Sequence, residues 1–286
     1  MHLYTLEYAT QNTYEFPPQG GLLQFQIIPE DQGSQELLSN QIQHTPGTRL
    51  EHAFSAFGVP CFRLIPVRAS TTIEFSARFQ VKKQETNPFD MPNRLPVHEE
   101  YKALRDLHTR VDQEPFLRLT PLTTLPQQAD LPFVMDTTQG IFENLQRLNQ
   151  WIYEAFSFET GVTDTATGLA AILNTRKGVC QDFTHLFIAF AKANHIPARY
   201  VSGYLHQGHG FQGDAQMHAW AECYLPHVGW KGFDPTNNIL TDVNHIKVCH
   251  GKDYTDCAPL KGVLFSSGSN STTYTVKVET QQQQQQ

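Results

Sequence analysis

The hydrophobic period of the chain changes near its middle, and this change limits the folds that the chain can adopt. In the first ninety residues, apolar and polar residues roughly alternate, most clearly at 72–79. From Thr137 onward, apolar residues such as Ile141, Leu145 and Leu148 recur every three to four positions. Alternation is typical of strands and the longer step is typical of helices. We therefore predict an α+β protein whose β part precedes its helices.

The β part predicts a small antiparallel, β-sandwich-like domain over residues 1–90. Turns rich in glycine and proline separate its expected strands at 3–16, 22–29 and 71–82. Residues 91–135 predict a linker that contains a short helix at 98–112 and an extended, proline-rich stretch at 115–126.

Residues 136–280 predict the second domain, in which helices come first and strands follow. The expected helices lie at 141–156, at 167–174 and from Cys180 onward. The expected strands lie at 198–205, 217–225, 229–233 and 272–278. Six glutamines at 281–286 predict a disordered tail.

Composition excludes several classes of protein. A formal net charge of −7 offers no basic surface for phosphates, so nucleic acid is not an expected partner. No apolar run of about 18 residues occurs and the first residues lack a leader pattern, so we expect no membrane segment and a cytoplasmic location. The five cysteines form no C-x-x-C pair, which disfavours a structural zinc site, and we expect no metal and no cofactor.

Cys180 stands where a glycine turn, Lys177-Gly178-Val179, meets the start of a predicted amphipathic helix. The free N–H groups of a first helical turn favour a thiolate over a thiol and can bind an oxyanion. Taken alone, a buried structural cysteine would also explain this residue.

His218 and Asp234 lie on two predicted strands that a turn at 226–229 would join as a hairpin. Placing Leu225 opposite Gly229 brings Ala221 near Phe233, so Asp234 falls within a residue or two of His218. A carboxylate there can orient one imidazole nitrogen and leave the other for a thiol. The sequence therefore predicts a Cys180–His218–Asp234 triad.

Three blocks carry a resemblance to a known family. They are 176–182 around Cys180, 218–222 beginning His-Ala-Trp, and 229–237 containing Asp234-Pro235-Thr236-Asn237. Together these blocks resemble the signature of the transglutaminase-like superfamily, and His245-Ile246 with 251–254 is similar to the C-terminal block of its bacterial members. The resemblance spans nearly the whole chain and is densest from about 165 to 260.

The resemblance implies a nucleophile at a helix start packed on an antiparallel sheet, and thiol-dependent acyl transfer on an amide or peptide bond. We expect hydrolysis of a peptide or protein amide; transfer to an amine, as in a transglutaminase, and a non-catalytic interaction module on the same fold stay open as alternatives. Trp220, Gln181 and Asp182 are the expected substrate-binding residues. No sequence feature indicates an oligomeric state.

Other histidines and cysteines carry weaker hypotheses. His185 is expected to pack or to form hydrogen bonds on the far side of the Cys180 helix, and a metal site of Cys180, His185, His206 and His209 lacks a recognised ligand spacing. Cys249 and His250 are adjacent, so their side chains should diverge. Residues 206–216 predict an exposed connector, which we also expect to border the substrate cleft.

Overall fold

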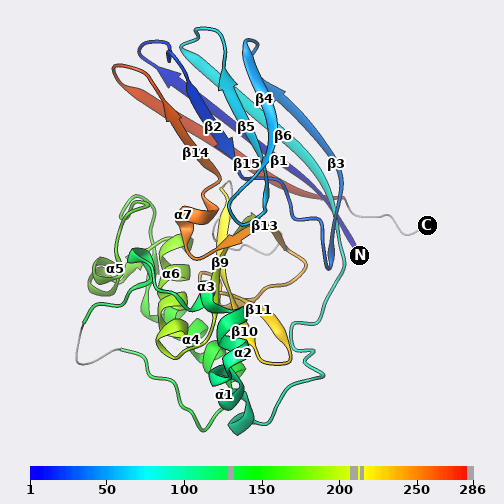
Figure 1. Cartoon of the computed structure of the whole chain (residues 1–286), viewed down its shortest axis with the longest axis vertical. Helices are drawn as coiled ribbons and strands as arrows, with labels where there is room; N and C mark the ends of the chain where they lie inside the picture. Colours follow the sequence, from blue (N-terminus) through cyan, green and yellow to red (C-terminus); the bar gives the residue numbers. More distant parts are fainter. Residues whose placement is uncertain (128–131, 207–211, 213–215, 282–286) are drawn as a thin grey trace.

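The structure is a computed structural model of the chain, and it describes residues 1–127, 132–206, 212 and 216–281. A β-sandwich forms one part of the molecule, and a core of helices and a five-stranded sheet forms the other (Figure 1). No helix in the described ranges is long and apolar enough to cross a membrane.

The sandwich consists of two antiparallel four-stranded sheets with the orders β15-β1-β6-β3 and β14-β2-β5-β4. Their strands are β1 (His2–Tyr14), β2 (Gly21–Phe25), β3 (Gln35–His44), β4 (Thr48–Phe54), β5 (Pro60–Pro66), β6 (Thr72–Lys83), β14 (Leu260–Leu264) and β15 (Asn270–Gln281). Large apolar side chains fill the space between the sheets, and the rings of Phe25 and Phe75 stack with centroids 4.0 Å apart. The predicted strands at 3–16 and 71–82 are confirmed as β1 and β6, and the one at 22–29 is confirmed only in its first half, because β2 ends at Phe25.

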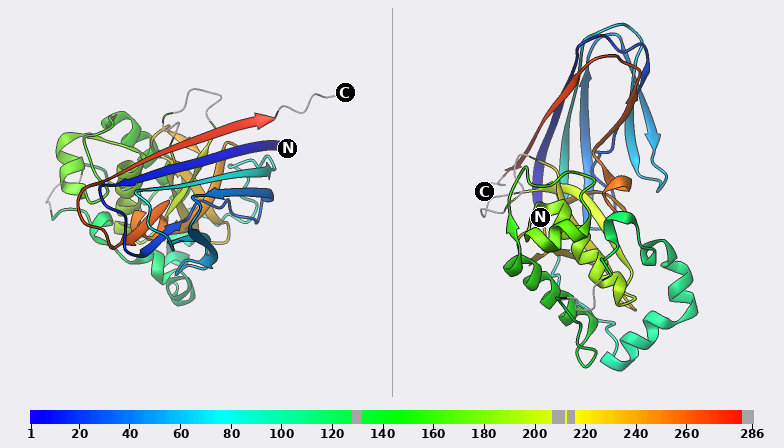
Figure 2. Two further views of the ribbon diagram at one scale, coloured as in Figure 1. Left: turned by 90° about the horizontal axis from the view of Figure 1, so that it is seen from above. Right: turned by 90° about the vertical axis from the view of Figure 1, so that its left-hand side faces the viewer.

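The two ends of the chain build the sandwich together, which differs from the predicted extent of the second domain. Residues of β15 pair with β1 from Leu3↔Gln281 to Tyr14↔Asn270, and β14 pairs with β2. Figure 2 shows β1 and β15 running side by side. Residues 260–281 therefore belong with the sandwich, although 136–280 was expected to form one domain. Sequence separation hides this pairing, because a strand pattern does not name its partner. Residues 282–286 of the predicted tail lie outside the described residues.

The helices between the sandwich and the core correct the predicted linker. Asp106 ends α1 (Val97–Arg105) and caps α2 (Leu107–Asp112) by accepting from the His108 N–H at 2.9 Å, so the predicted helix at 98–112 is broken in two. The stretch expected to be extended contains α3 (Glu114–Leu117) and the 3-10 helix η1 (Pro121–Thr123). A proline stands in the first positions of each, where its missing N–H costs nothing.

A third antiparallel sheet with the order β12-β11-β10-β9-β13 carries the core. Its strands are β9 (Ala198–Leu205), β10 (His218–Leu225), β11 (Gly229–Asp234), β12 (Ile239–Leu240) and β13 (His245–Gly251). The helices that accompany it are α4 (Ile141–Ala155), α5 (Leu169–Thr175), α6 (Cys180–Ala193) and α7 (Tyr254–Cys257). A short parallel pair, β7 (Ser157–Phe158) and β8 (Lys177–Gly178), joins the chain on either side of α5.

Helix α6 packs against β10 and is buried on nearly every side, as expected for a helix that is apolar around most of its circumference. The ring of Phe187 stacks on Phe233 of β11 with centroids 5.3 Å apart. The pairs Leu225↔Gly229 and Ala221↔Phe233 confirm the predicted register of the β10–β11 hairpin. Helix and hairpin together place the first turn of α6 beside the ends of β10 and β11.

Candidate active site

Cys180 is the first residue of α6, and its neighbour Asp182 holds the turn that leads into the helix. The Asp182 carboxylate accepts from the Val179 N–H at 2.9 Å and from the Thr163 hydroxyl at 2.6 Å. A Cβ on Gly178 would stand 2.8 Å from the Asp182 side chain, so this close approach requires glycine. Burial raises the pKa of Asp182, and the two hydrogen bonds oppose that rise.

The backbone N–H groups of Cys180 and Gln181 stand at the open end of α6. The first four N–H groups of a helix have no intrahelical partner. Those of Asp182 and Phe183 bond to the Val179 carbonyl at 3.0 and 3.1 Å. Within the described residues the N–H groups of Cys180 and Gln181 form no hydrogen bond, so both can donate to a negatively charged oxygen beside the Cys180 sulfur.

His218, at the start of β10, is bound to Asp234, at the end of β11. Nε2 of His218 lies 2.8 Å from Oδ2 of Asp234, and both side chains are fully buried. Nδ1 of His218 is buried and has no hydrogen-bond partner among the described residues. Cys180 and His218 line the same cavity of about 290 Å³, so Nδ1 is the imidazole nitrogen available to the thiol.

Asp234 is fixed by the Asp-Pro-Thr-Asn turn that follows β11. Its Oδ1 accepts from the backbone N–H groups of Thr236 at 3.0 Å and Asn237 at 3.3 Å. The Asn237 side chain donates to Oδ2 at 2.8 Å.

Asn237 also contacts the connector before β10, because its side chain accepts from the Gln212 N–H at 2.8 Å. Gln216 of that connector lines the cavity, as expected for a border of the cleft, while most of its other residues, His209 included, lie outside the described ranges.

The charges of this group favour an imidazolium. Burial alone would lower the pKa of His218, but the Asp234 carboxylate and, to a smaller extent, the nearby Cys180 sulfur raise it to about 10. Burial alone would raise the pKa of Asp234, but its contacts with His218 and His245 hold it well below its usual range. At neutral pH the geometry therefore stabilises a protonated His218 between a carboxylate and a sulfur atom.

His245, the first residue of β13, completes the surroundings of Asp234. Its Nε2 lies 3.3 Å from Oδ2 of Asp234, and its Nδ1 lies 3.1 Å from Oδ1 of Asp242. We did not predict a site role for it: in the sequence it appeared only in the C-terminal block of the family resemblance. A histidine within a short strand is a feature of the sequence that could have indicated this role. The pairing of that strand with β9, however, cannot be read from the sequence.

His218, Asp234 and His245 also bring three potential metal-ligand atoms within 4.8 Å of one another. The same atoms are already joined by the hydrogen bonds described above. A cation placed there would have to replace those bonds.

The three expected substrate-binding residues lie in different surroundings. Gln181 lines the cavity beside Cys180. Asp182 is buried behind the turn, where its carboxylate accepts the hydrogen bond from Val179 that holds the start of α6. Trp220 is 1% exposed and packs edge-on against His245, with centroids 5.2 Å apart, and beside His218, with centroids 6.3 Å apart, but it does not line the cavity.

The other histidine and cysteine candidates from the sequence have structural roles. His185 is buried on α6 and accepts from the Tyr254 N–H at 3.1 Å, as expected of a packing histidine; burial lowers its pKa to about 4. Cys249 is buried against the Cys257 carbonyl, whereas the ring of His250 lies 5.9 Å from Phe116, so the two side chains diverge as expected. All five cysteines are free thiols.

Comparison with known proteins agrees with this fold. Residues 132–235 match the model of the transglutaminase-like superfamily. A solved structure from Cytophaga hutchinsonii, provisionally described as a cysteine protease, covers 98% of this chain and 90% of its own at a TM-score of 0.69 and 20% identity, which shows a shared fold.

Two curated mycobacterial relatives are uncharacterized proteins. One from Mycobacterium tuberculosis is 39% identical over 140 residues, which span 46% of this chain and 45% of the relative, so the match covers less than half of that protein. One from Mycobacterium leprae is 28% identical over 95% of this chain and 96% of its own length.

The class that fold and comparisons define is an α+β protein with N-terminal β-sheets and a transglutaminase-like core. The transglutaminase-like match covers residues 132–235, which contain Cys180, His218 and Asp234.

Proposed function

We propose that this protein transfers acyl groups from an amide or peptide bond through a Cys180 thioester. The observation that carries the proposal is the shared cavity of Cys180 and His218, with the far imidazole nitrogen of His218 held 2.8 Å from Asp234. Nucleophile, base and orienting carboxylate in this relation are the elements of thiol catalysis. The transglutaminase-like core supports the same reaction class.

The reaction would begin when the Cys180 thiolate attacks the carbonyl carbon and the C=O electron pair moves to oxygen. The N–H groups of Cys180 and Gln181 would hold that oxyanion. Collapse of the intermediate breaks the C–N bond, and the leaving amine takes the proton from Nδ1 of His218. Asp234 keeps the ring oriented and stabilises its charged form.

The thioester then passes its acyl group to an acceptor. With water, His218 removes a proton from the attacking molecule, and the products are a carboxylic acid and the regenerated thiol. With an amine, the product is a new amide. We favour hydrolysis, because water needs no second binding site, which makes the protein a cysteine peptidase or amidase.

The test begins with substitution of the proposed nucleophile. Wild type, Cys180→Ala and Cys180→Ser are incubated with fluorogenic peptide amides, and the acyl-enzyme is sought by mass spectrometry. We expect hydrolysis and a mass adduct on the Cys180 peptide in wild type alone. The buried thiol variant Cys223→Ala is the control, because Cys223 lies in β10 away from the cavity lining.

Two outcomes would oppose the proposal. Equal activity of Cys180→Ala would remove Cys180 as the nucleophile. Absence of activity and of thiol adduct in wild type would favour the interaction module. A second reaction series with a primary amine separates the acceptors, because an amide product in place of the acid would identify a transglutaminase.

A further inference from the structure

The cavity beside Cys180 is walled by both parts of the molecule. Cys180 and His218 form one side, and Tyr200 of β9 with Tyr254 of α7 continue the core wall. The sandwich supplies further wall residues, among them Tyr8 of β1 and Tyr274 of β15. The site is therefore incomplete without the sandwich.

The pairing of β1 with β15 sends these two sandwich tyrosines to one face of the sheet. Tyr8 lies opposite Val276, and Thr10 lies opposite Tyr274. Residues opposite each other and residues two apart share a face, so Tyr8 and Tyr274 point to the same side. Tyr8 is buried, whereas Tyr274 is 45% exposed and forms the lip of the cavity.

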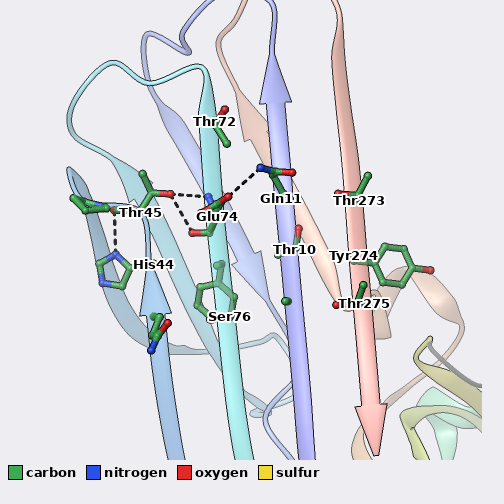
Figure 3. Close-up of a pocket in the computed structure, with 14 residues that line it drawn as sticks. Thr10, Gln11, His44, Thr45, Thr72, Glu74, Ser76, Thr273, Tyr274 and Thr275 are labelled. Atoms are coloured by element: carbon green, nitrogen blue, oxygen red, sulfur yellow. Dashed lines mark hydrogen bonds between the residues drawn. The ribbon is translucent and has the colours of Figure 1, made fainter.

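The alternate residues of the same strands face outward, as Figure 3 shows. Thr273 and Thr275 line a groove of about 620 Å³ on that outer side, which the intervening Tyr274 also borders. In this groove the Gln11 side chain donates to Glu74 at 2.9 Å. In Figure 3 the Tyr274 ring extends from β15 away from β1. Thr273 is therefore a residue next to Tyr274 in the sequence whose side chain lies on the opposite face of the sheet.

The hydroxyls of Tyr8, Tyr200, Tyr254 and Tyr274 form no hydrogen bond with any other described residue, whereas the hydroxyl of the core residue Tyr204 donates to the Ile27 carbonyl at 2.8 Å. The Cys180 sulfur contributes to raising the pKa of Tyr200, Tyr254 and Tyr274, after burial as the main cause, which agrees with their place around it. Four phenol rings with free hydroxyls can pack on an apolar group and hydrogen-bond its polar edge.

No aspartate, glutamate, lysine or arginine lines this cavity within the part of the chain that the structure describes. The charge on His218 is already balanced by Asp234. A charged side chain that entered would lose its hydration without gaining an ion pair. The volume of about 290 Å³ stands at the lower end of ligand pockets, so it suits a single small segment.

We propose that the β-sandwich is part of the substrate site, and that its Tyr8 and Tyr274 together with Tyr200 and Tyr254 select an uncharged, preferably aromatic acyl group beside Cys180. The inference rests on the proposed function in one respect: Cys180 is the residue that the selected group approaches. Acidic and basic acyl groups are excluded by the same surface.

The test measures selectivity without requiring turnover. Three probes share one iodoacetamide warhead and carry a benzyl, a carboxybenzyl or an aminomethylbenzyl group. Labelling rates of the Cys180 peptide at pH 7 are divided by the rates of the same probes with glutathione, which removes their intrinsic reactivity. We expect the neutral probe to exceed both charged probes by about tenfold, the effect of one unpaired buried charge.

The variant Tyr274→Ala should bring the three normalised rates toward equality, because it opens the lip to water. Thr273→Ala should keep the wild-type ratio, since its side chain faces the outer groove. Unfolding midpoints of both variants check that the sandwich is intact, and the exposure of both sites favours folding. Equal rates for the three probes in wild type, or an unchanged ratio in Tyr274→Ala, would overturn the inference.

The two proposals fail separately. Labelling requires only the Cys180 thiol and the cavity, so a protein without amidase activity still reports the selectivity. Conversely, amide hydrolysis without discrimination between the probes would leave the reaction proposal standing and remove only the role of the tyrosines.

Discussion

Nε2 of His245 lies 3.3 Å from Oδ2 of Asp234, the same oxygen atom that binds Nε2 of His218 at 2.8 Å. One carboxylate oxygen therefore serves two imidazoles. His245 is itself held by Asp242 through its other nitrogen. Asp234 is thus held by a residue of β13 in addition to His218, and its orientation depends on β13 as well as on its own turn.

His245→Gln should weaken catalysis by moving Asp234. Loss of one hydrogen bond to a charged group is worth about 1.5–3 kcal/mol, so we expect kcat/KM to fall roughly 10- to 100-fold with little change in KM. Steady-state kinetics measure this effect. His206→Gln is the control, because His206 bonds Asn244 instead of Asp234. A normal kcat in His245→Gln would show that the turn alone positions Asp234.

Asp234→Asn should move the alkaline limb of the pH–rate profile. The His218 imidazolium is present below its pKa of about 10 and is lost as pH rises through that value. Without the carboxylate, burial lowers the pKa of His218, so the limb should shift to lower pH. By analogy with other triads, kcat should fall by on the order of 10⁴-fold. An alkaline limb that stays in place would contradict the assignment of that limb to His218.

Glu222→Gln should destabilise the fold. Glu222 of β10 is bound by Arg199 at 2.6 Å and by Lys247 at 2.8 Å, with its side chain largely buried. Removal of one member of a buried pair costs about 3 kcal/mol. Urea unfolding at pH 7 measures this change. Glu51→Gln is the control, because its partner Arg49 is at the surface and the loss should stay below about 1 kcal/mol.

The same carboxylate predicts how stability depends on pH. Burial opposes ionisation of Glu222, but Lys247 and Arg199 outweigh it and lower its pKa to about 2. Its contribution is therefore complete above the unfolded value of about 4.3 and is lost as pH falls toward 2. The difference between wild type and Glu222→Gln should shrink across this interval. A constant difference between pH 7 and pH 3 would argue against ionic stabilisation.

A chelator should leave the proposed activity unchanged. In the arrangement described, Asp234 orients His218 directly by a hydrogen bond, so the triad needs no ion at this position. Rates are compared before and after dialysis against EDTA. Excess Zn²⁺ should inhibit, because it competes for the free thiol and imidazole atoms of Cys180 and His218. Loss of rate on chelation, restored by one cation, would instead assign a metal to His218, Asp234 and His245.

The sequence predicted what depends on local pattern. The start of α6 at Cys180 followed from a glycine turn before an apolar helix, and the approach of Asp234 to His218 followed from the length of one hairpin. Both predictions use residues that are near in sequence, where the period and the turn determine the geometry.

Contacts between distant segments could not be predicted in this way. His245 reaches Asp234 only because β13 pairs with β9, and Tyr274 reaches the cavity only because β15 pairs with β1. Trp220 shares the predicted face of His218, with ring centroids 6.3 Å apart, but its ring packs in the core against His245 and does not line the cavity. Alternation assigns faces along one strand but does not determine which strands meet.

The pairing of β15 with β1 has a mechanical consequence. The entire core is an insertion between β6 and β14 of one sandwich, so two connections cross between the parts. The connection from α7 to β14 spans only Ala258 and Pro259, and Pro259 itself lines the Cys180 cavity. Pro259 and Tyr274 line the same cavity, so any displacement of the sandwich relative to the core would change the width of the cleft beside the thiol.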